Sequence, residues 1–405
     1  MKQAILYIWF QLATGICNGI AGEILGKYNS IEEIYNCNDF SFLGDKKQKY
    51  INRLENKDTS QAFEILKRCQ SMGAQVVGYY DNLYPKSLRR IPTPPSVLYV
   101  MGDLKSLNGI PCVAVVGKRK MTSAGKDIAE NFAYNFCKSG AYVISGLAAG
   151  IDTAAHRGAI MAGGYTVAVL GNPIGDVYPK ENLKAFQTLY QRGAVISEMY
   201  PGCPRTKADF PNRNRIISGL SDAIVVIEAG EPSGALITAR HGLEQGKHVF
   251  AVPGAIGTEN SGTNTLIKNG VPAATEPQDI ISVLVLEYPE IMRQYAPSVT
   301  SKLRSYGTAP LTEEPIKEEP IAEIPVKTEN ISAPEEVTAL PQENGGNTLA
   351  DKILSALSIS KPISADELTQ ITGIAVSEIM CELTVMEIEG KVLASPGGRY
   401  TKAKA

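Results

Sequence analysis

Short apolar runs alternate with amphipathic segments from residue 110 to residue 285, and this order restricts the possible folds more than any other feature of the sequence. Runs that are apolar throughout are typical of strands buried on both faces, whereas the longer segments have the periodicity of helices. The alternation predicts a Rossmann-like α/β domain, with a parallel sheet covered by helices on both faces and ligands at the carboxyl ends of the strands. We expect strands at 112–116, 141–145, 165–170, 194–197, 222–227 and 247–252, and helices near 123–138, 151–162, 181–192, 212–219 and 234–246.

Further domains are expected on both sides, because 405 residues exceed what one hydrophobic core usually supports. Residues 1–72 have helical periodicity and predict a small helical domain, and residues 73–109 lead into the α/β domain. The turn at 15–17 suggests a helix-hairpin-helix, whose N–H groups can meet a DNA phosphate, although a structural helical cap explains it equally well. The helices are expected at the start of the chain and near 18–28, 30–36 and 58–72.

The C-terminal third predicts a linker followed by a winged-helix domain. We assign residues 286–348 to an acidic, proline-rich linker, because the stretch at 307–349 contains six prolines, nine glutamates and no aromatic residue. Such a stretch cannot bury enough apolar surface to offset its ordering entropy. Residues 349–405 predict the winged helix. Its expected elements are a helix at 349–358, a second helix capped by Ser364 and Glu367, a third helix at 376–389, and a hairpin with strands at 392–394 and 399–401.

Charge is distributed unevenly along the chain, whose net charge is −2. Residues 1–109 carry 13 basic and 10 acidic groups, residues 110–285 carry 16 and 14, and residues 286–405 carry 11 and 18. A basic surface for nucleic acid is therefore compatible with the first two parts. The third helix of the winged helix contains four glutamates and no Lys or Arg, so we expect that domain to bind protein rather than duplex DNA.

Cysteine and histidine usage bounds the compartment and the chemistry. The seven cysteines are scattered and never spaced as CxxC, which argues against a disulfide framework or a zinc site, and three histidines make a histidine-rich metal site improbable. The apolar run from Ala4 to Phe10 is interrupted by Gln11 and precedes no clear cleavage site, which favours a buried helix over a secretory signal. We expect a cytoplasmic protein with no membrane segment and no cofactor.

The loops after the predicted strands combine glycines with cations, as is needed to present N–H groups and positive charge to phosphates. The first loop has three consecutive cations at 118–120 but no GxGxxG, so it suits a polyanion better than a dinucleotide. At 210–217 two arginines accompany an aromatic residue, a combination suited to the phosphates and bases of a single strand. The residues expected to bind DNA are Gly117, Lys118, Arg119, Gly146, Gly150, Asp152, Lys180, Phe210, Arg213, Asn214, Arg215, Ser233 and Gly234.

Structural roles are the alternative for several of these side chains. Asp152 can cap the helix that follows its loop instead of contacting a base edge. Phe210 can belong to the core, and the two arginines that follow it can pair with acids such as Glu198 or Glu228.

Four sequence motifs, in this order and spacing, closely resemble the DNA processing protein A (DprA/Smf) family. They are GLAAGIDTAAH at 146–156, VYPKEN at 177–182, FPNRNRIISGL at 210–220 and SGALITA at 233–239. Residues 78–102 resemble the family's lead-in to its Rossmann domain, and residues 350–402 resemble its winged helix. The similarity therefore covers nearly everything except the linker.

The resemblance implies a protein that binds and protects single-stranded DNA, forms a homodimer through its Rossmann domain, and helps to load the RecA recombinase during natural transformation. It implies no enzymatic activity. The sequence departs from the family pattern at two loop positions, where Lys118 adds a charge and Ala149 removes one. The family's DNA-contacting residues fall on Arg119, Lys180, Arg213 and Arg215.

Two other functions compete with this one. The same Rossmann variant resembles phosphoribohydrolases that cleave nucleoside monophosphates, but those enzymes need a PGGxGTxxE motif, and Thr238 stands where its glutamate belongs. Glu228 and Asp152 remain candidate acid/base groups for such a reaction. A pure scaffold, whose glycine loops bind nothing, leaves the cations that recur at the strand ends unexplained.

Overall fold

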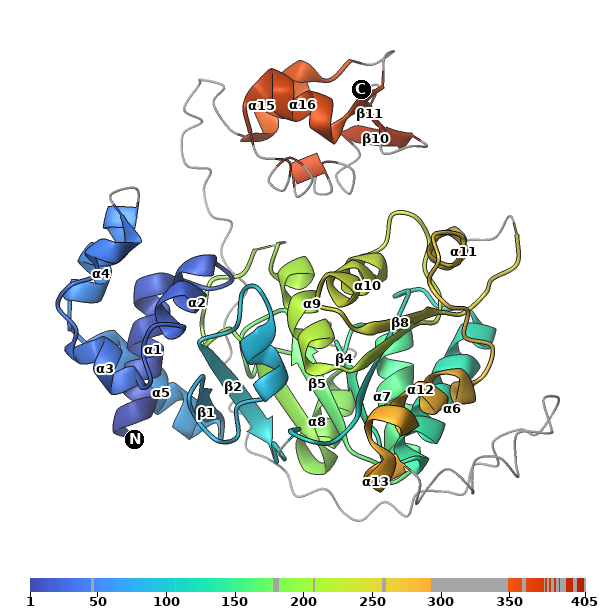
Figure 1. Cartoon of the computed structure of the whole chain (residues 1–405), viewed down its shortest axis with the longest axis horizontal. Coiled ribbons are helices and arrows are strands. Elements are labelled where there is room, and N and C mark those ends of the chain that lie inside the picture. The colour runs from blue at the N-terminus through green and yellow to red at the C-terminus, as the bar shows by residue number, and fades with distance from the viewer. Residues whose placement is uncertain are drawn as a thin grey trace, which may run out of the picture. The chain divides into compact units, whose positions relative to one another are not determined.

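The computed structural model divides into two compact units, Met1–Tyr306 and Gly307–Ala405, which are described separately (Figure 1). Among the residues that the structure describes, no helix is long and apolar enough to cross a membrane. These residues are 1–44, 47–105, 107–177, 182–206, 208–256, 260–292, 349–358 and 362–374, together with 376, 379, 382–383, 386, 391–395 and 399–403.

An eight-stranded sheet forms the centre of the first unit (Figure 1), in the order β1-β2-β6-β5-β4-β3-β7-β8. Its strands are β1 (Gln75–Gly78), β2 (Val97–Gly102), β3 (Cys112–Val116), β4 (Tyr142–Ser145), β5 (Thr166–Leu170), β6 (Ala194–Ser197), β7 (Ala223–Val226) and β8 (His248–Ala251). The six strands from β3 to β8 are parallel, which confirms the predicted Rossmann-like core. Every residue of β3, β5, β6 and β7 is buried, as expected for strands covered on both faces.

Two antiparallel strands extend the sheet beyond the predicted parallel core. β2 pairs antiparallel with β6, placing Tyr99 opposite Ser197, and β1 pairs antiparallel with β2. Both strands fall in the predicted lead-in at 73–109, because they precede the alternation of strands and helices. The fully buried apolar run Val97–Val100 was the available signal, since a run of this kind is typical of an interior strand.

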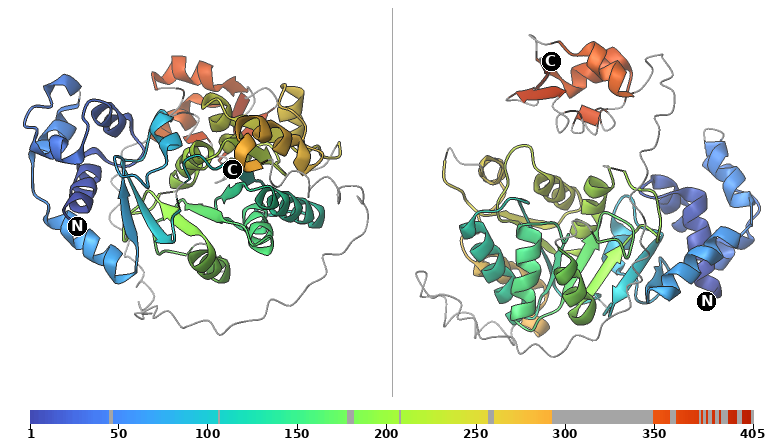
Figure 2. Two further views of the ribbon diagram at one scale, coloured as in Figure 1. Left: turned by 60° about the horizontal axis from the view of Figure 1, so that its bottom comes forward. Right: turned by 180° about the vertical axis from the view of Figure 1, so that it is seen from behind.

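Helices cover both faces of the sheet (Figure 2). Side chains alternate along each strand, so β3 directs Ala114 to one core and Val113 to the other. The first core is closed by α9 (Asp209–Leu220), α10 (Gly234–Glu244) and α11 (Ser261–Lys268). The opposite face is covered by α6 (Ser123–Lys138), α7 (Ile151–Met161), α8 (Leu183–Arg192) and α12 (Pro277–Glu287).

The ordered core extends beyond the predicted linker boundary at residue 286. That position lies inside α12, and α13 (Pro289–Met292) follows it, with Met292 fully buried in the same core as α6 and α7. The apolar residues that continue past 285 therefore still contribute to the core. Most of the predicted linker, from residue 293 to residue 348, lies outside the described residues.

The N-terminal helices pack against the β2 end of the sheet. Tyr99 of β2 and Val195 of β6 share one apolar core with them. Gln11 strengthens this junction, because it accepts a hydrogen bond from the Tyr99 hydroxyl at 2.8 Å and donates one to the Glu198 carbonyl at 2.8 Å. The helices are α1 (Lys2–Thr14), α2 (Gly19–Leu25), α3 (Ile31–Asn36), α4 (Gln48–Glu55) and α5 (Ser60–Ser71), of which α4 was not expected.

In the second unit, the first two predicted helices and the predicted hairpin strands of the winged helix are present. The capping box is confirmed: Ser364 Oγ accepts from the Glu367 N–H at 3.2 Å, and Glu367 Oε2 accepts from the Ser364 N–H at 2.8 Å. The hairpin strands are present, whereas most of the expected third helix, including Glu378, lies outside the described residues. The elements are α15 (Leu349–Ala356), β9 (Ile363–Ser364), α16 (Ala365–Thr372), β10 (Val392–Ser395) and β11 (Arg399–Lys402).

Candidate nucleic-acid interface

The carboxyl edge of the parallel strands brings a cation and an aromatic ring together. Arg119, in the loop after β3, is exposed, and its guanidinium carbon lies 5.6 Å from the centroid of the half-buried Phe210 ring at the start of α9. Lys118 is half-buried and Lys120 is exposed in the same loop. Lys120 was not among the expected contacts, although it belongs to the run of three cations. The arrangement offers positive charge next to a ring that can stack on a base.

Two glycines allow the loops at this edge to pack through their backbones. A Cβ at Gly117 would lie 2.7 Å from Ile151 Cγ1, so only glycine fits between the first loop and α7. Gly150, with φ of 87°, is the N-cap of α7, and a Cβ there would overlap the Lys118 carbonyl oxygen. That oxygen accepts the Ile151 N–H at 3.1 Å. The loop that presents Arg119 therefore rests directly on the beginning of α7.

Asp152 is not the cap of α7, whose N-cap is Gly150, and its side chain is buried below the edge. Its buried carboxylate accepts hydrogen bonds from the Gly146 N–H at 3.1 Å and the Ala148 N–H at 3.4 Å. Burial raises its pKa, while the charge of Arg213 and these hydrogen bonds oppose the rise. Asp152 thus fixes the loop after β4 from inside the protein.

Arg213 is buried, and its guanidinium group binds the backbone of two neighbouring strands. Nη1 donates to the Gly146 carbonyl at 2.7 Å and to the Val169 carbonyl, and Nε donates to the Asn214 side chain at 3.2 Å. Burial lowers the pKa of Arg213 to about 10, against the nearby charge of Asp152. The side chain joins α9 to the ends of β4 and β5.

Arg215 is also buried, and it pairs with Glu198, as the structural alternative anticipates. Its Nη2 lies 2.7 and 2.8 Å from the two carboxylate oxygens, and its Nε donates to Thr93 at 3.0 Å. Burial opposes the charge, but the Glu198 carboxylate outweighs it and the pKa of Arg215 is raised. The structure favours structural roles for Arg213 and Arg215, and our proposal for DNA contact omits both.

The remaining predicted residues divide between the edge and the interior. Ser233 is the N-cap of α10 and accepts the Ala235 N–H at 3.3 Å, while Gly234 is exposed beside it. Asn214 is buried and donates to the Gly234 carbonyl at 3.1 Å, linking α9 to this helix start. Lys180 lies outside the described residues.

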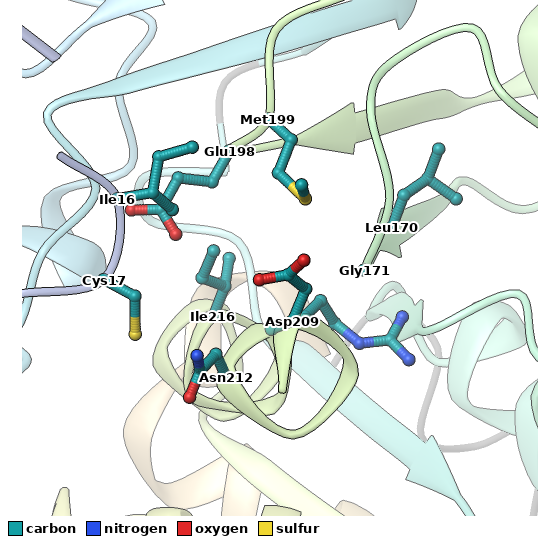
Figure 3. A pocket seen from close by; sticks show the side chains of 10 residues that line it. Ile16, Cys17, Leu170, Gly171, Glu198, Met199, Asp209, Asn212 and Ile216 are labelled. Carbon is teal, nitrogen blue, oxygen red and sulfur yellow. The ribbon is translucent and has the colours of Figure 1, made fainter. Parts of the chain in front are cut away.

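A small pocket lies where the turn between α1 and α2 meets the start of α9 (Figure 3). Its volume is about 60 Å³, far below the ~300 Å³ of a typical ligand pocket. The carboxylates of Glu198 and Asp209 border it together with Cys17 and Met199, as Figure 3 shows. A pocket of this size is too small for a nucleotide, and among the described residues Arg213 is its only basic lining residue beside the two carboxylates.

His156 of α7 makes stability depend on pH. It is buried, Nδ1 lies 2.7 Å from Thr166 Oγ1, and Nε2 has no hydrogen-bond partner. Burial, assisted by the charge of Arg213, lowers its pKa from 6.5 to about 3. Below pH 6.5 the unfolded chain therefore takes up a proton at His156 that the folded chain does not bind. The free energy of unfolding consequently falls with decreasing pH until about pH 3. We expect this difference in protonation to lower the free energy of unfolding by about 2 kcal/mol between pH 7 and pH 5.

Chemical denaturation of the His156→Gln variant at several pH values measures this contribution. The variant should lose less stability between pH 7 and pH 5 than the wild type. The control is His248→Gln, because the His248 side chain is 41% exposed and paired with Glu287 at 2.8 Å, and it should keep the steep wild-type dependence. Equal pH dependence in the wild type and His156→Gln would contradict the assignment.

Comparisons with known proteins agree with this architecture. The family model described as DNA recombination-mediator protein A matches residues 75–285, and that of the DprA winged helix domain matches residues 337–398. Protein Smf of Synechocystis is 33% identical over 344 residues, which cover 84% of this chain and 83% of that protein. DNA processing protein DprA of Bacillus subtilis is 36% identical over 232 residues, covering 57% of this chain and 77% of the relative.

A solved structure shows the same fold. The X-ray structure of DNA processing protein A from Streptococcus pneumoniae superposes with a TM-score of 0.53 and 31% sequence identity, covering 70% of this chain and 93% of that one. Family models therefore match both the α/β core and the winged helix, and a relative matches over most of its own length. The chain belongs to the DNA processing protein A (DprA/Smf) family of DNA-processing proteins.

Proposed function

We propose that this protein binds single-stranded DNA, without catalysing a reaction on it, at the carboxyl edge of its parallel strands. The observation that carries the proposal is the exposed Arg119 guanidinium next to the Phe210 ring. Arginine neutralises a phosphate and the ring offers a stacking surface for an unpaired base, whereas the bases of a duplex already stack on one another. Base preference should be slight, because every base has a face that stacks.

Further contacts at the same edge support the proposal. Lys118 and Lys120 add charge around Arg119, and the exposed start of α10 at Ser233 and Gly234 offers a helix N-terminus to a phosphate. We retain Lys180 as a proposed contact on the family resemblance alone.

We also propose that the protein acts as a homodimer, joined through the Rossmann-like domain, and delivers DNA to the RecA recombinase during natural transformation. The family description as a recombination mediator supports the second part. Sedimentation of the purified chain tests the dimer. The rate at which RecA assembles on a single strand coated by a single-strand-binding protein tests the delivery, and a rate that this chain does not raise would contradict it.

The Arg119→Glu variant tests the binding edge directly. We expect its affinity for oligo-dT to fall about 10- to 100-fold, the loss that follows removal of a charge-assisted hydrogen bond. The slope of log affinity against log salt should flatten by about 0.7, because one phosphate fewer is neutralised. Fluorescence anisotropy with labelled oligo-dT and a matching duplex, at several salt concentrations, gives both quantities.

The matched control is Arg192→Glu. Arg192 is exposed at the end of α8, where the chain enters β6, so it lies at the opposite edge of the sheet. The control should bind oligo-dT as the wild type does, and the wild type should prefer the single strand to the duplex. Equal losses in both variants would show that the edge is not the binding surface. If neither DNA binds, hydrolysis of nucleoside monophosphates is the next assay.

A further inference from the structure

The first turn of α6 is the place where mononucleotide-binding folds of this kind hold a phosphate. In such sheets the helix after the first strand of the parallel core points its N-terminus at the ligand, and its free N–H groups and dipole favour an anion. Here that strand is β3 and that helix is α6, which has 16 residues. The turn is already occupied by Glu228, which follows β7.

Glu228 places its carboxylate at this turn through two hydrogen bonds from Thr122, the N-cap residue of α6. Oε2 accepts the Thr122 N–H at 3.0 Å, and Oε1 accepts the Thr122 hydroxyl at 2.5 Å. The Thr122 hydroxyl oxygen in turn accepts the Gly125 N–H at 2.9 Å, which uses a further donor of the first turn. The Glu228 side chain is buried, with 4% of the residue exposed.

Gly125 provides the space for this carboxylate. A Cβ at Gly125 would lie 2.5 Å from Glu228 Oε2, so any larger residue there would displace the acid. In a nucleotide-binding loop, a glycine at such a position lets the backbone approach a phosphate. Here Gly125 makes room for the Glu228 carboxylate instead.

Main-chain hydrogen bonds also join the segments after β3 and β7, independently of the Glu228 side chain. β3 and β7 are neighbours at the point where the strand order reverses. Their pairing continues past both strands, because the Ile227 N–H donates to the Val116 carbonyl at 3.0 Å and the Lys118 N–H donates to the Glu228 carbonyl at 2.9 Å. The two loops are therefore joined where a nucleotide would have to separate them.

We propose that Glu228 is a built-in substitute for phosphate that excludes inorganic phosphate and free mononucleotides from the α6 N-terminus. A second anion there would displace or face a buried carboxylate. DNA phosphates are consequently met only by groups on the outer side of the edge, such as Arg119, so the protein distinguishes a strand from its nucleotides. This last step rests on the proposed function, whereas the closed anion site does not.

The first test is thermal unfolding in chloride and in 50 mM phosphate at matched ionic strength. Glu228→Ala vacates the α6 turn, so phosphate should raise the melting temperature of this variant by about 2 °C or more beyond its effect on the wild type. Glu231→Ala is the control, because Glu231 is exposed in the same loop, and it should respond to phosphate as the wild type does. An equal response in all three proteins would overturn the proposal.

The second test uses the wild type alone and decides the question even if Glu228→Ala does not fold. Labelled oligo-dT is competed with unlabelled oligo-dT and with dTMP at equal nucleotide concentration. We expect dTMP to be at least 100-fold weaker, and competition within tenfold of the oligonucleotide would overturn the proposed exclusion. If the wild type does not bind oligo-dT at all, the proposed function fails, while the phosphate response of Glu228→Ala still judges the anion site.

Discussion

Glu198→Ala is expected to lower the free energy of unfolding by about 3–5 kcal/mol, the usual cost of leaving a buried charge without its partner. Arg215 is only 5% exposed, and both oxygens of Glu198 bind its Nη2 at 2.7 and 2.8 Å. With the carboxylate gone, the guanidinium group keeps its desolvation cost and loses the opposite charge that offsets it.

Chemical denaturation measures this effect, and Glu64→Ala is its control. Glu64 pairs with Lys67 at 2.9 Å, but both side chains are more than half exposed, so its loss should cost about 0–1 kcal/mol. The double variant Glu198→Met, Arg215→Met removes both charges and should recover part of the loss. A Glu198→Ala protein no less stable than Glu64→Ala would mean that the buried pair contributes nothing to stability.

Gly150→Ala is expected to lower the free energy of unfolding by about 3–5 kcal/mol and also to weaken the binding of single-stranded DNA. The backbone at Gly150 has φ of 87° and ψ of −132°, a region open almost only to glycine. A Cβ would also overlap the Lys118 carbonyl oxygen and lie 2.5 Å from that of Arg119. Because the new Cβ would overlap backbone atoms, the overlap is relieved only if the loop that carries Arg119 moves. The backbone strain and the steric overlap both contribute to the loss of stability.

Gly163→Ala separates the two causes. Gly163, just after α7, also has a positive φ of 69°, but a Cβ there meets nothing within 4 Å. The free energy of unfolding of Gly163→Ala should fall by about 1–2 kcal/mol because of the backbone conformation alone. This variant should keep its affinity for oligo-dT. Denaturation together with anisotropy compares the two variants. If Gly150→Ala binds oligo-dT as tightly as Gly163→Ala, the position of the first loop does not control DNA binding.

The parallel core could be predicted because its strands are apolar on both faces. β3 was expected at 112–116 and is observed at Cys112–Val116, and the N-cap at Ser233 follows from a hydroxyl placed just before an apolar helix. β1 and β2 were missed for a topological reason. An antiparallel addition at the edge of a sheet breaks no local rule of sequence, and nothing local shows that Tyr99–Gly102 pairs with a strand about a hundred residues later.

In the candidate site, the sequence shows where loop glycines are needed but not which side chains are buried. The glycines at 117 and 150 have the close contacts expected of loop glycines. Arg213 and Arg215 were taken for DNA contacts, because arginines next to an aromatic residue suit a nucleic acid. Sequence does not show which side of α9 faces the sheet, and Glu198 becomes the partner of Arg215 only after β6 and α9 have packed.

Glu198 joins three parts of the first unit through two different groups. Its carbonyl accepts a hydrogen bond from the Gln11 side chain of α1. Its carboxylate binds Arg215 of α9, the helix whose first turn contains Phe210. A displacement of α1 is therefore expected to reach α9 through Glu198 as well as through the turn between α1 and α2, which meets the start of α9. The N-terminal helices can therefore influence the proposed DNA-binding edge without touching DNA, because they share contacts with the helix that carries Phe210.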